Sequence, residues 1–340
     1  MASFKADDKT RFSARDSLAC KFSASRFNYF KDPFIESIYE GLNRTNGVLA
    51  NVRRSPIIHR GYFARSEGFA KVLELFLERT SAAPSRQVVF LGPGFDTSPL
   101  IPYVSGAENV HTFEVDFPDI MSKKVELYRA EPEIVSLLEK GTQADAEATT
   151  GTPSSSIVKM GPLSFIAQDL RRAEAVTADL VAAGLRGDVP TLVLSECVLV
   201  YVAKAAVLDL CHRLGSLLQD AVWLTYDMIT PNDVYGRNMI KNLEAAGFDI
   251  PGIRDFPSLE QQQSRFLETG WGEVRSCTMQ HYFDSVMPGA QKERVCKLEM
   301  LDEVEEFNLL MSHYSLTLAC KGESASTAAI LDFIPQAAPS

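Results

Sequence analysis

The stretch VVFLGPGFDT, Val88–Thr97, carries the signal from which the fold is predicted. A short apolar run, typical of a buried strand, leads into a turn that contains Gly92 and Gly94, and a candidate helix follows. Glycines allow a tight turn and let a ligand approach the backbone N–H groups that a helix start leaves unpaired. Thr97 stands where a dinucleotide fingerprint has its third glycine, and Gly-x-Gly alone is weak evidence. The stretch predicts a nucleotide or nucleoside pocket, with an ordinary turn as the alternative.

Acidic residues lie near the ends of the next strand candidates. Asp116, in FEVDF, follows Gly94 by 22 residues and is placed to accept hydrogen bonds from ribose hydroxyls. Asp169, in QDL, is placed to accept from an adenine amino group. Glu196, in SECVLVY, lies in an apolar run where an unpaired carboxylate costs roughly 2–7 kcal/mol. Taken singly, Asp169 also fits a helix N-cap and Glu196 a salt-bridged core acid. Taken together, these acids favour a nucleoside site.

Strand-like and helix-like patterns alternate along the chain, which predicts an α/β fold with a largely parallel sheet. The predicted strands are Gln87–Gly92, Val110–Asp116, Ser164–Leu170, Thr191–Val200, Ala221–Ile229, Glu273–Phe283 and His313–Lys321. The last two are expected to form an edge pair with at least one antiparallel strand. The predicted helices include Ala64–Thr80, Asp119–Lys140, Ala203–Gln219, Pro257–Thr269 and Leu298–Ser312.

The composition is that of a soluble globular protein. Of 340 residues, 46% are hydrophobic and 23% charged, and the net charge of -10 disfavours nucleic-acid partners. The six cysteines form no C-x-x-C pair, so neither a metal site nor a disulfide framework is predicted. The first residues lack the apolar run of a secretory signal, and the longest apolar stretch, Val189–Val202, is too short for a membrane span. We therefore expect a cytoplasmic protein without a membrane partner.

Basic residues in the N-terminal segment are candidates for binding a carboxylate. SPIIHRGYFARSEG, Ser55–Gly68, places Arg60 and Arg65 among aromatic residues, and Lys21 lies upstream in LACKFSA. A guanidinium group binds a carboxylate through two parallel hydrogen bonds. A purely structural role for these arginines is the alternative.

The sequence resembles the leucine carboxyl methyltransferases that act on the catalytic subunit of protein phosphatase 2A. The matching motifs are LACKFSA, KDPFI, RGYFAR, LGPGFDT, FEVDFP, QDL, PTLVLSECVLVY, WLTYDM with GRNMIKNL, and LDEVEEFNLLMSHY. Their order and spacing over about 300 residues are more specific than any one of them. The chain has Pro93, Ser195 and His59 where the family usually has Ala, Ala and Asn.

The resemblance implies a class I S-adenosylmethionine-dependent methyltransferase fold. This fold is a Rossmann-like seven-stranded sheet with an antiparallel last strand and added helical substrate-binding elements. Residues 1–84 would form an N-terminal helical cap that contributes to the pocket, and residues 85–325 the methyltransferase domain. Within that domain we expect a mobile loop at 141–156 and a lid insertion at 231–268. Residues 326–340 would form a C-terminal tail.

The resemblance also implies the site residues. S-adenosylmethionine would be bound by Lys21, Arg65, Gly92, Asp116, Asp169, Leu170 and Glu196, to which the glycine turn adds Gly94. Tyr201 and Arg65 would act at the reacting carboxylate. We expect one cation to hold the carboxylate of the cofactor and Tyr201 to offer a weaker bond to the substrate, although the sequence does not distinguish Lys21 from Arg65 in this role.

The implied reaction is methyl esterification of the C-terminal leucine of the phosphatase catalytic subunit. It needs no general base, because an α-carboxyl group with a pKa of about 3.3–3.7 is already ionised at pH 7. A small-molecule carboxylate is an alternative substrate, and a non-catalytic adenosine-binding scaffold is an alternative function. Related enzymes act on a modified tRNA base through a longer chain with an added repeat domain, which we do not expect here. A monomer is the default expectation.

Overall fold

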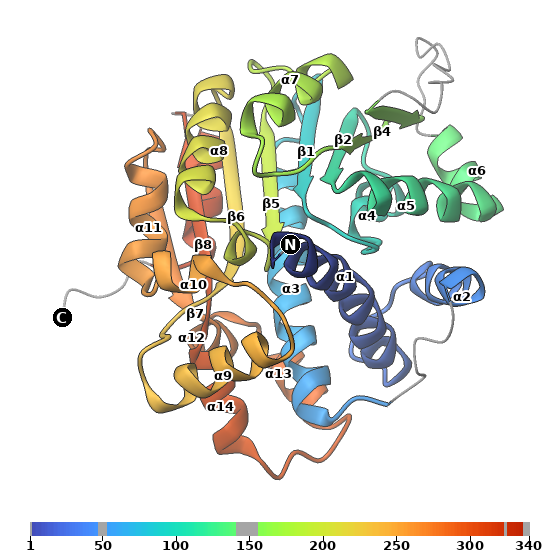
Figure 1. Ribbon diagram of the computed structural model, residues 1–340. Helices are drawn as coiled ribbons and strands as arrows, with labels where there is room; N and C mark the ends of the chain where they lie inside the picture. The colour runs from blue at the N-terminus through green and yellow to red at the C-terminus, as the bar shows by residue number, and fades with distance from the viewer. Residues whose placement is uncertain (1, 47–52, 141–155, 323–324, 336–340) are drawn as a thin grey trace.

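The computed structural model of the protein describes residues 2–46, 53–140, 156–322 and 325–335. In these residues one mixed sheet of eight strands lies between two layers of helices (Figure 1). The predicted loop 141–156 lies outside the described residues except for Ser156. The α/β architecture predicted from the sequence is confirmed.

The strands follow the order β3-β4-β2-β1-β5-β6-β8-β7 across the sheet. The strands from β4 to β6 in this order are parallel, whereas β8 runs antiparallel to both β6 and β7. This confirms the antiparallel last strand and the predicted edge pair. The bounds are β1 Arg86–Leu91, β2 Val110–Asp116, β3 Ile157–Met160, β4 Leu163–Ala167, β5 Thr191–Glu196, β6 Ala221–Met228, β7 Val274–Thr278 and β8 Tyr314–Lys321.

The sheet has eight strands, one more than the seven expected from the resemblance. Strand β3 pairs with β4 as an antiparallel hairpin, and Gly161, at φ +57°, forms the turn between them. The pattern VKMGPLSF contains this turn, but β3 has only four residues and they are at most half-buried. A strand this short and exposed has little apolar signal in the sequence.

The helices cover both faces and the edges of the sheet. The α-helices are α1 Ala2–Arg26, α2 Ile35–Asn46, α3 Pro56–Arg79, α4 Ile101–Val104, α5 Pro118–Ala130, α6 Pro132–Lys140, α7 Ala173–Ala183, α8 Lys204–Leu217, α9 Val234–Ala245, α10 Pro251–Asp255, α11 Leu259–Leu267, α12 Met279–His281, α13 Gly289–Cys296, α14 Val304–Ser312 and α15 Ala325–Ala328. Short 3-10 or π turns occur at η1 Ser98–Leu100, η2 Leu199–Tyr201, η3 Tyr282–Val286 and η4 Ala329–Phe333. None of the helices within the described ranges is long and apolar enough to cross a bilayer.

Among the predicted elements that end or divide early, three do so for a clear local reason. The run Thr191–Val200 stops being a strand after Glu196, because Cys197 adopts a left-handed φ of +59° and η2 follows. The run Glu273–Phe283 ends at Thr278, whose hydroxyl caps α12. The predicted helix Asp119–Lys140 is divided at Pro132, which has no N–H to continue it.

The core forms because successive strand residues point to opposite faces of the sheet. In β1, Val88 and Phe90 pack in the same apolar cluster as α3, whereas Val89 and Leu91 pack in the cluster that includes α7 and α8. The predicted apolar stripe of α3 is buried against the sheet. This packing fixes the carboxyl end of β1, and with it the glycine turn that follows.

The segments predicted as a lid and as a tail also contact the body of the protein. In residues 231–268, α11 packs against β7 and β8. In residues 326–340, of which the last five lie outside the described residues, Ile330 and Leu331 are buried in the α3 cluster.

Candidate functional site

A cavity of about 660 Å³ lies at the carboxyl ends of the central parallel strands. Figure 1 shows the N-terminal end of α1 beside these strand ends. The volume of this cavity is within the range of about 300–1,000 Å³ found for small-molecule sites. All nine residues predicted from the sequence line it: Lys21, Arg65, Gly92, Gly94, Asp116, Asp169, Leu170, Glu196 and Tyr201.

The glycine turn after β1 requires both of its glycines. Gly92 and Gly94 have φ of +63° and +56°, a region that L side chains rarely adopt. A Cβ atom on Gly92 would lie 2.6 Å from Val198, and one on Gly94 would lie 2.9 Å from Ala14 of α1. The turn is therefore packed between the η2 segment and α1, and it presents its backbone to the cavity.

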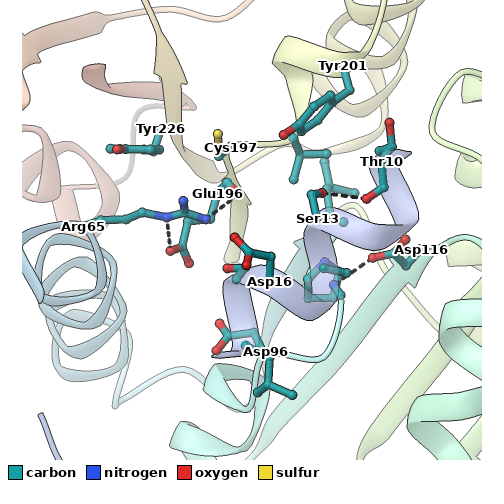
Figure 2. A pocket seen from close by; sticks show the side chains of 18 of the residues that line it. Thr10, Ser13, Asp16, Arg65, Asp96, Asp116, Glu196, Cys197, Tyr201 and Tyr226 are labelled. Carbon is teal, nitrogen blue, oxygen red and sulfur yellow. Dashed lines mark hydrogen bonds and ion pairs between the residues drawn. The ribbon is translucent and has the colours of Figure 1, made fainter. Parts of the chain in front are cut away.

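Asp116 ends β2 beside this turn (Figure 2). Its Oδ2 accepts a hydrogen bond from the Gly94 N–H at 2.8 Å, and its Oδ1 accepts from the Phe117 N–H at 2.7 Å. Burial raises the pKa of Asp116 to about 6, although these two N–H groups act in the opposite direction. The two N–H groups therefore orient the carboxyl group, and mildly acidic pH is enough to neutralise it.

Asp169 follows β4 and is bound to a neighbouring arginine. Its Oδ1 accepts from the Nε and the backbone N–H of Arg171, both at 2.9 Å. The same guanidinium donates to both carboxylate oxygens of Asp7 in α1, each at 2.9 Å. The alternative of a helix N-cap does not apply, because Arg172 is the N-cap of α7. Asp169 instead connects the sheet to the helix that covers the cavity, and Leu170 beside it is buried.

Glu196 holds both predicted cations at the end of β5. The Nε of Arg65 donates to its Oε1, and the Nζ of Lys21 lies 3.3 Å from its Oε2. The ammonium of Lys21 also donates to the Asp96 carboxylate at 3.0 Å. The salt-bridge alternative for Glu196 is thus correct, and the bridged groups also line the cavity.

The charges of this network stabilise one another. Burial opposes the charge of Lys21, but the carboxylates of Asp96 and Glu196 outweigh it and raise the pKa of the ammonium. For Arg65 as well, burial acts against the charge and Glu196 raises the pKa. Burial opposes the charge of Asp96, yet Lys21 and the other donors around it lower the pKa of its carboxyl group. All three groups are therefore charged at neutral pH.

Arg65 is held between aromatic rings, whereas Arg60 points elsewhere. The Arg65 guanidinium lies 4.9 Å from the ring centre of Tyr226 and 5.3 Å from that of Tyr62. Figure 2 shows Arg65 extending toward Glu196 with Tyr226 nearby. Arg60 is buried and donates to the Glu299 carbonyl at 3.3 Å, outside the residues that line the cavity. Of the two arginines in this segment, Arg60 therefore fits the alternative of a purely structural role.

Tyr201 approaches the cavity from η2. Its ring centre lies 6.3 Å from that of Phe248, in the segment predicted as a lid. Burial raises the pKa of the Tyr201 hydroxyl well above its ordinary value. The hydroxyl is therefore protonated at neutral pH and can donate a hydrogen bond.

Asp96 and Cys197 are among the residues of the cavity wall that sequence reasoning missed. Asp96, which binds Lys21, is the acid of the quoted stretch LGPGFDT, so its position directly after the turn was the available signal. Cys197 has a left-handed φ, and its N–H donates to the Tyr226 carbonyl at 2.7 Å. No local signal marks Cys197, because its conformation depends on the contact with β6.

Within the described ranges, no group of three or more His, Cys, Asp or Glu residues is arranged to hold a metal ion.

Comparisons with known proteins place the chain in a family. The profile of the leucine carboxyl methyltransferase family matches residues 5–215. Leucine carboxyl methyltransferase 1 of Bos taurus is 30% identical over 318 residues, which cover 94% of this chain and 91% of that protein. The tRNA wybutosine-synthesizing protein 4 of Homo sapiens is 29% identical over 90% of this chain, but the chain spans only 43% of that protein's length.

Among solved structures, a putative methyltransferase from Thermobifida fusca has the same fold. The TM-score is 0.52 at 11% identity, and the match covers 91% of this chain and 94% of the other. The sequence matches and the shared fold agree with each other. The chain therefore belongs to the leucine carboxyl methyltransferase family and is a methyltransferase.

Proposed function

We propose that the protein methylates the C-terminal leucine carboxylate of the protein phosphatase 2A catalytic subunit, with S-adenosylmethionine as the methyl donor. The observation that carries this proposal is the convergence of Lys21, Arg65 and the Tyr201 hydroxyl on one cavity. Ammonium, guanidinium and phenol groups can all donate hydrogen bonds to a carboxylate. Family membership supports the leucine carboxylate as the acceptor.

The lining of the cavity fits this cofactor at two ends. Asp116 and Asp169 supply carboxylates for ribose hydroxyls and an adenine amine, and Leu170 supplies apolar contact. At the other end, Lys21 and Arg65 supply positive charge for an amino-acid carboxylate, while Glu196 limits the net charge there. When bound, S-adenosylmethionine supplies a methyl group on a positively charged sulfonium.

The residues of the chain act by orientation rather than by proton transfer. Alignment of reacting groups contributes roughly 7–11 kcal/mol in well-oriented systems, and the fixed Arg65 guanidinium and Tyr201 hydroxyl are placed to provide it. Tyr201 donates a neutral hydrogen bond to the substrate carboxylate, which withdraws less electron density from the attacking oxygen than an ion pair would. Apolar lining residues, including Leu243 and Phe248, exclude water that would otherwise solvate the carboxylate.

Transfer of labelled methyl from S-adenosylmethionine to the intact phosphatase catalytic subunit tests the proposal. A leucine methyl ester releases volatile, base-labile methanol, and a substrate whose terminal Leu is changed to Ala should remain unlabelled. Binding of the cofactor without transfer to the phosphatase would contradict the proposal and favour a small-molecule acid or a scaffold.

The similarity to tRNA wybutosine-synthesizing protein 4 makes tRNA a second candidate acceptor. The net charge of -10 disfavours it, because a phosphate backbone is repelled by an acidic protein. Adding tRNA in place of the phosphatase to the same assay distinguishes the two acceptors.

A further inference from the structure

A completely buried ion pair lies behind the glycine turn. Lys124 of α5 and Glu114 of β2 both have fully buried side chains, and the lysine Nζ lies 2.5 Å from Glu114 Oε2. The same ammonium donates to the backbone carbonyl of Asp96 at 2.6 Å. Neither Lys124 nor Glu114 lines the cavity. Lys124 therefore contacts the turn from the protein interior.

The pair continues into the network of the cavity wall. The Asp96 backbone is held by Lys124, and the Asp96 carboxylate binds Lys21, which in turn binds Glu196. The signs of charge alternate from the core to the cavity through Glu114, Lys124, Asp96, Lys21, Glu196 and Arg65. A displacement of Lys124 would thus be transmitted to the cations of the cavity through direct contacts.

We propose that Lys124 is a positioning residue for the cofactor site. Its ammonium fixes the Asp96 carbonyl, and through Asp96 it sets the path of the glycine turn and the position of the Lys21 ammonium. Glu114 orients Lys124 by accepting a hydrogen bond from its ammonium. The inference rests on the proposed function only in taking S-adenosylmethionine as the ligand.

A contribution to stability alone does not explain the buried pair of Lys124 and Glu114. A buried ion pair loses the solvation of both charges, and apolar residues of similar volume are often as stable or more stable. Burial raises the pKa of Glu114 even beside Lys124, and its Oε1 has no hydrogen-bond partner among the described residues. An apolar pair could fill this space, but only a donor can hold the Asp96 carbonyl.

The experiment separates positioning from stability with two variants. Lys124→Met leaves Glu114 buried without a partner and is expected to lower the thermal unfolding midpoint. The double variant Glu114→Leu with Lys124→Met removes both charges and should recover most of that loss. Calorimetric titration with S-adenosylhomocysteine should still give a dissociation constant raised about tenfold in the double variant, because the Asp96 carbonyl has lost its closer donor and keeps only the Tyr128 hydroxyl, at 3.4 Å. In turnover assays the KM for S-adenosylmethionine should rise while kcat stays within about twofold.

A second buried pair provides the matched control. Asp227 of β6 and Arg265 of α11 are 2.8 Å apart and almost completely buried, but neither residue lines the cavity. Asp227→Leu with Arg265→Met should leave the dissociation constant within about twofold of the unmodified protein.

The outcomes separate this inference from the proposed function. If the unmodified protein binds S-adenosylhomocysteine and the Glu114, Lys124 double variant binds it equally well, Lys124 has no positioning role and the inference is overturned. A kcat loss with an unchanged KM in that variant would also overturn it. Failure of the unmodified protein to bind would overturn the proposed function, and the inference with it.

Discussion

Arg65 and Glu196 bind each other through two separate contacts. The Nε of Arg65 donates to the Glu196 side chain, and the Nη2 donates to the Glu196 carbonyl at 3.2 Å. The guanidinium plane is therefore fixed by the residue that ends β5. Arg65 is an oriented group with a paired charge, so a ligand carboxylate meets a site that is preorganised rather than strongly positive.

Glu196→Gln should weaken cofactor binding by about 10- to 100-fold, because the carboxylate that orients both Arg65 and Lys21 becomes neutral. Glutamine has nearly the same volume, so the change tests charge rather than packing. Calorimetry with S-adenosylhomocysteine measures the effect. An unchanged dissociation constant would show that the two cations keep their positions without Glu196.

Arg65→Ala and Tyr201→Phe should have different kinetic effects. Loss of Arg65 should raise the dissociation constant of the cofactor sharply, because Arg65 is one of the two cations proposed to hold the cofactor carboxylate. Tyr201→Phe removes the proposed donor to the substrate carboxylate, so kcat should fall about 10- to 100-fold while cofactor affinity changes little. Steady-state kinetics and calorimetry on both variants test this assignment, and the opposite pattern would refute it.

Cofactor affinity should decrease as the pH falls through about 6, because the pKa of Asp116 is raised to about 6 and only its carboxylate form would accept from both ribose hydroxyls in the proposed site. An ordinary aspartate would lose its charge near pH 3.8 instead. Titrations with S-adenosylhomocysteine between pH 5 and about pH 8 measure the midpoint. In Asp116→Asn the affinity should be lower and this step absent; a step of equal size in that variant would assign it to another group.

The raised pKa of Asp116 makes the stability of the ligand-free protein change with pH in the opposite direction to the cofactor affinity. The pKa of Asp116 is higher in the folded than in the unfolded chain, so the folded state binds more protons between about pH 4 and 6. Its contribution to the free energy of unfolding therefore decreases as the pH rises through this window. Denaturant unfolding of the native protein and Asp116→Asn at pH 4.5 and about pH 7 compares the two slopes.

Gly92→Ala should destabilise the protein more than Gly106→Ala. Both glycines have a left-handed φ, +63° and +71°, which costs an L residue roughly 1–2 kcal/mol. Only at Gly92 would the new Cβ also overlap Val198, at 2.6 Å, which adds about 1–3 kcal/mol.

Denaturant unfolding measures the difference, and the second substitution Val198→Ala in Gly92→Ala should recover the overlap contribution. Equal losses in the free energy of unfolding for the two alanine variants would show that Val198 moves aside without cost.

Much of the fold was accessible from the sequence because it is encoded locally. The apolar run of β1, the alternation of Glu114 and Asp116 in β2 and the positive φ that favours glycine after β1 all depend on residues close in sequence. Parallel strands bring their carboxyl ends to one edge, so acids after successive strands were expected to meet there. The short strand β3 was missed because four partly exposed residues carry little pattern.

The partners of the charged groups were decided only by the tertiary structure. Lys21 meets Asp96 across 75 residues and Glu196 across 175, and no spacing rule predicts such pairs. The sequence by itself determined which residue types stand at the strand ends, since strand and turn preferences act over a few residues. The packing of α1, α3 and α5 on those ends decided which charges pair, because a buried charge takes the opposite charge that folding brings nearest.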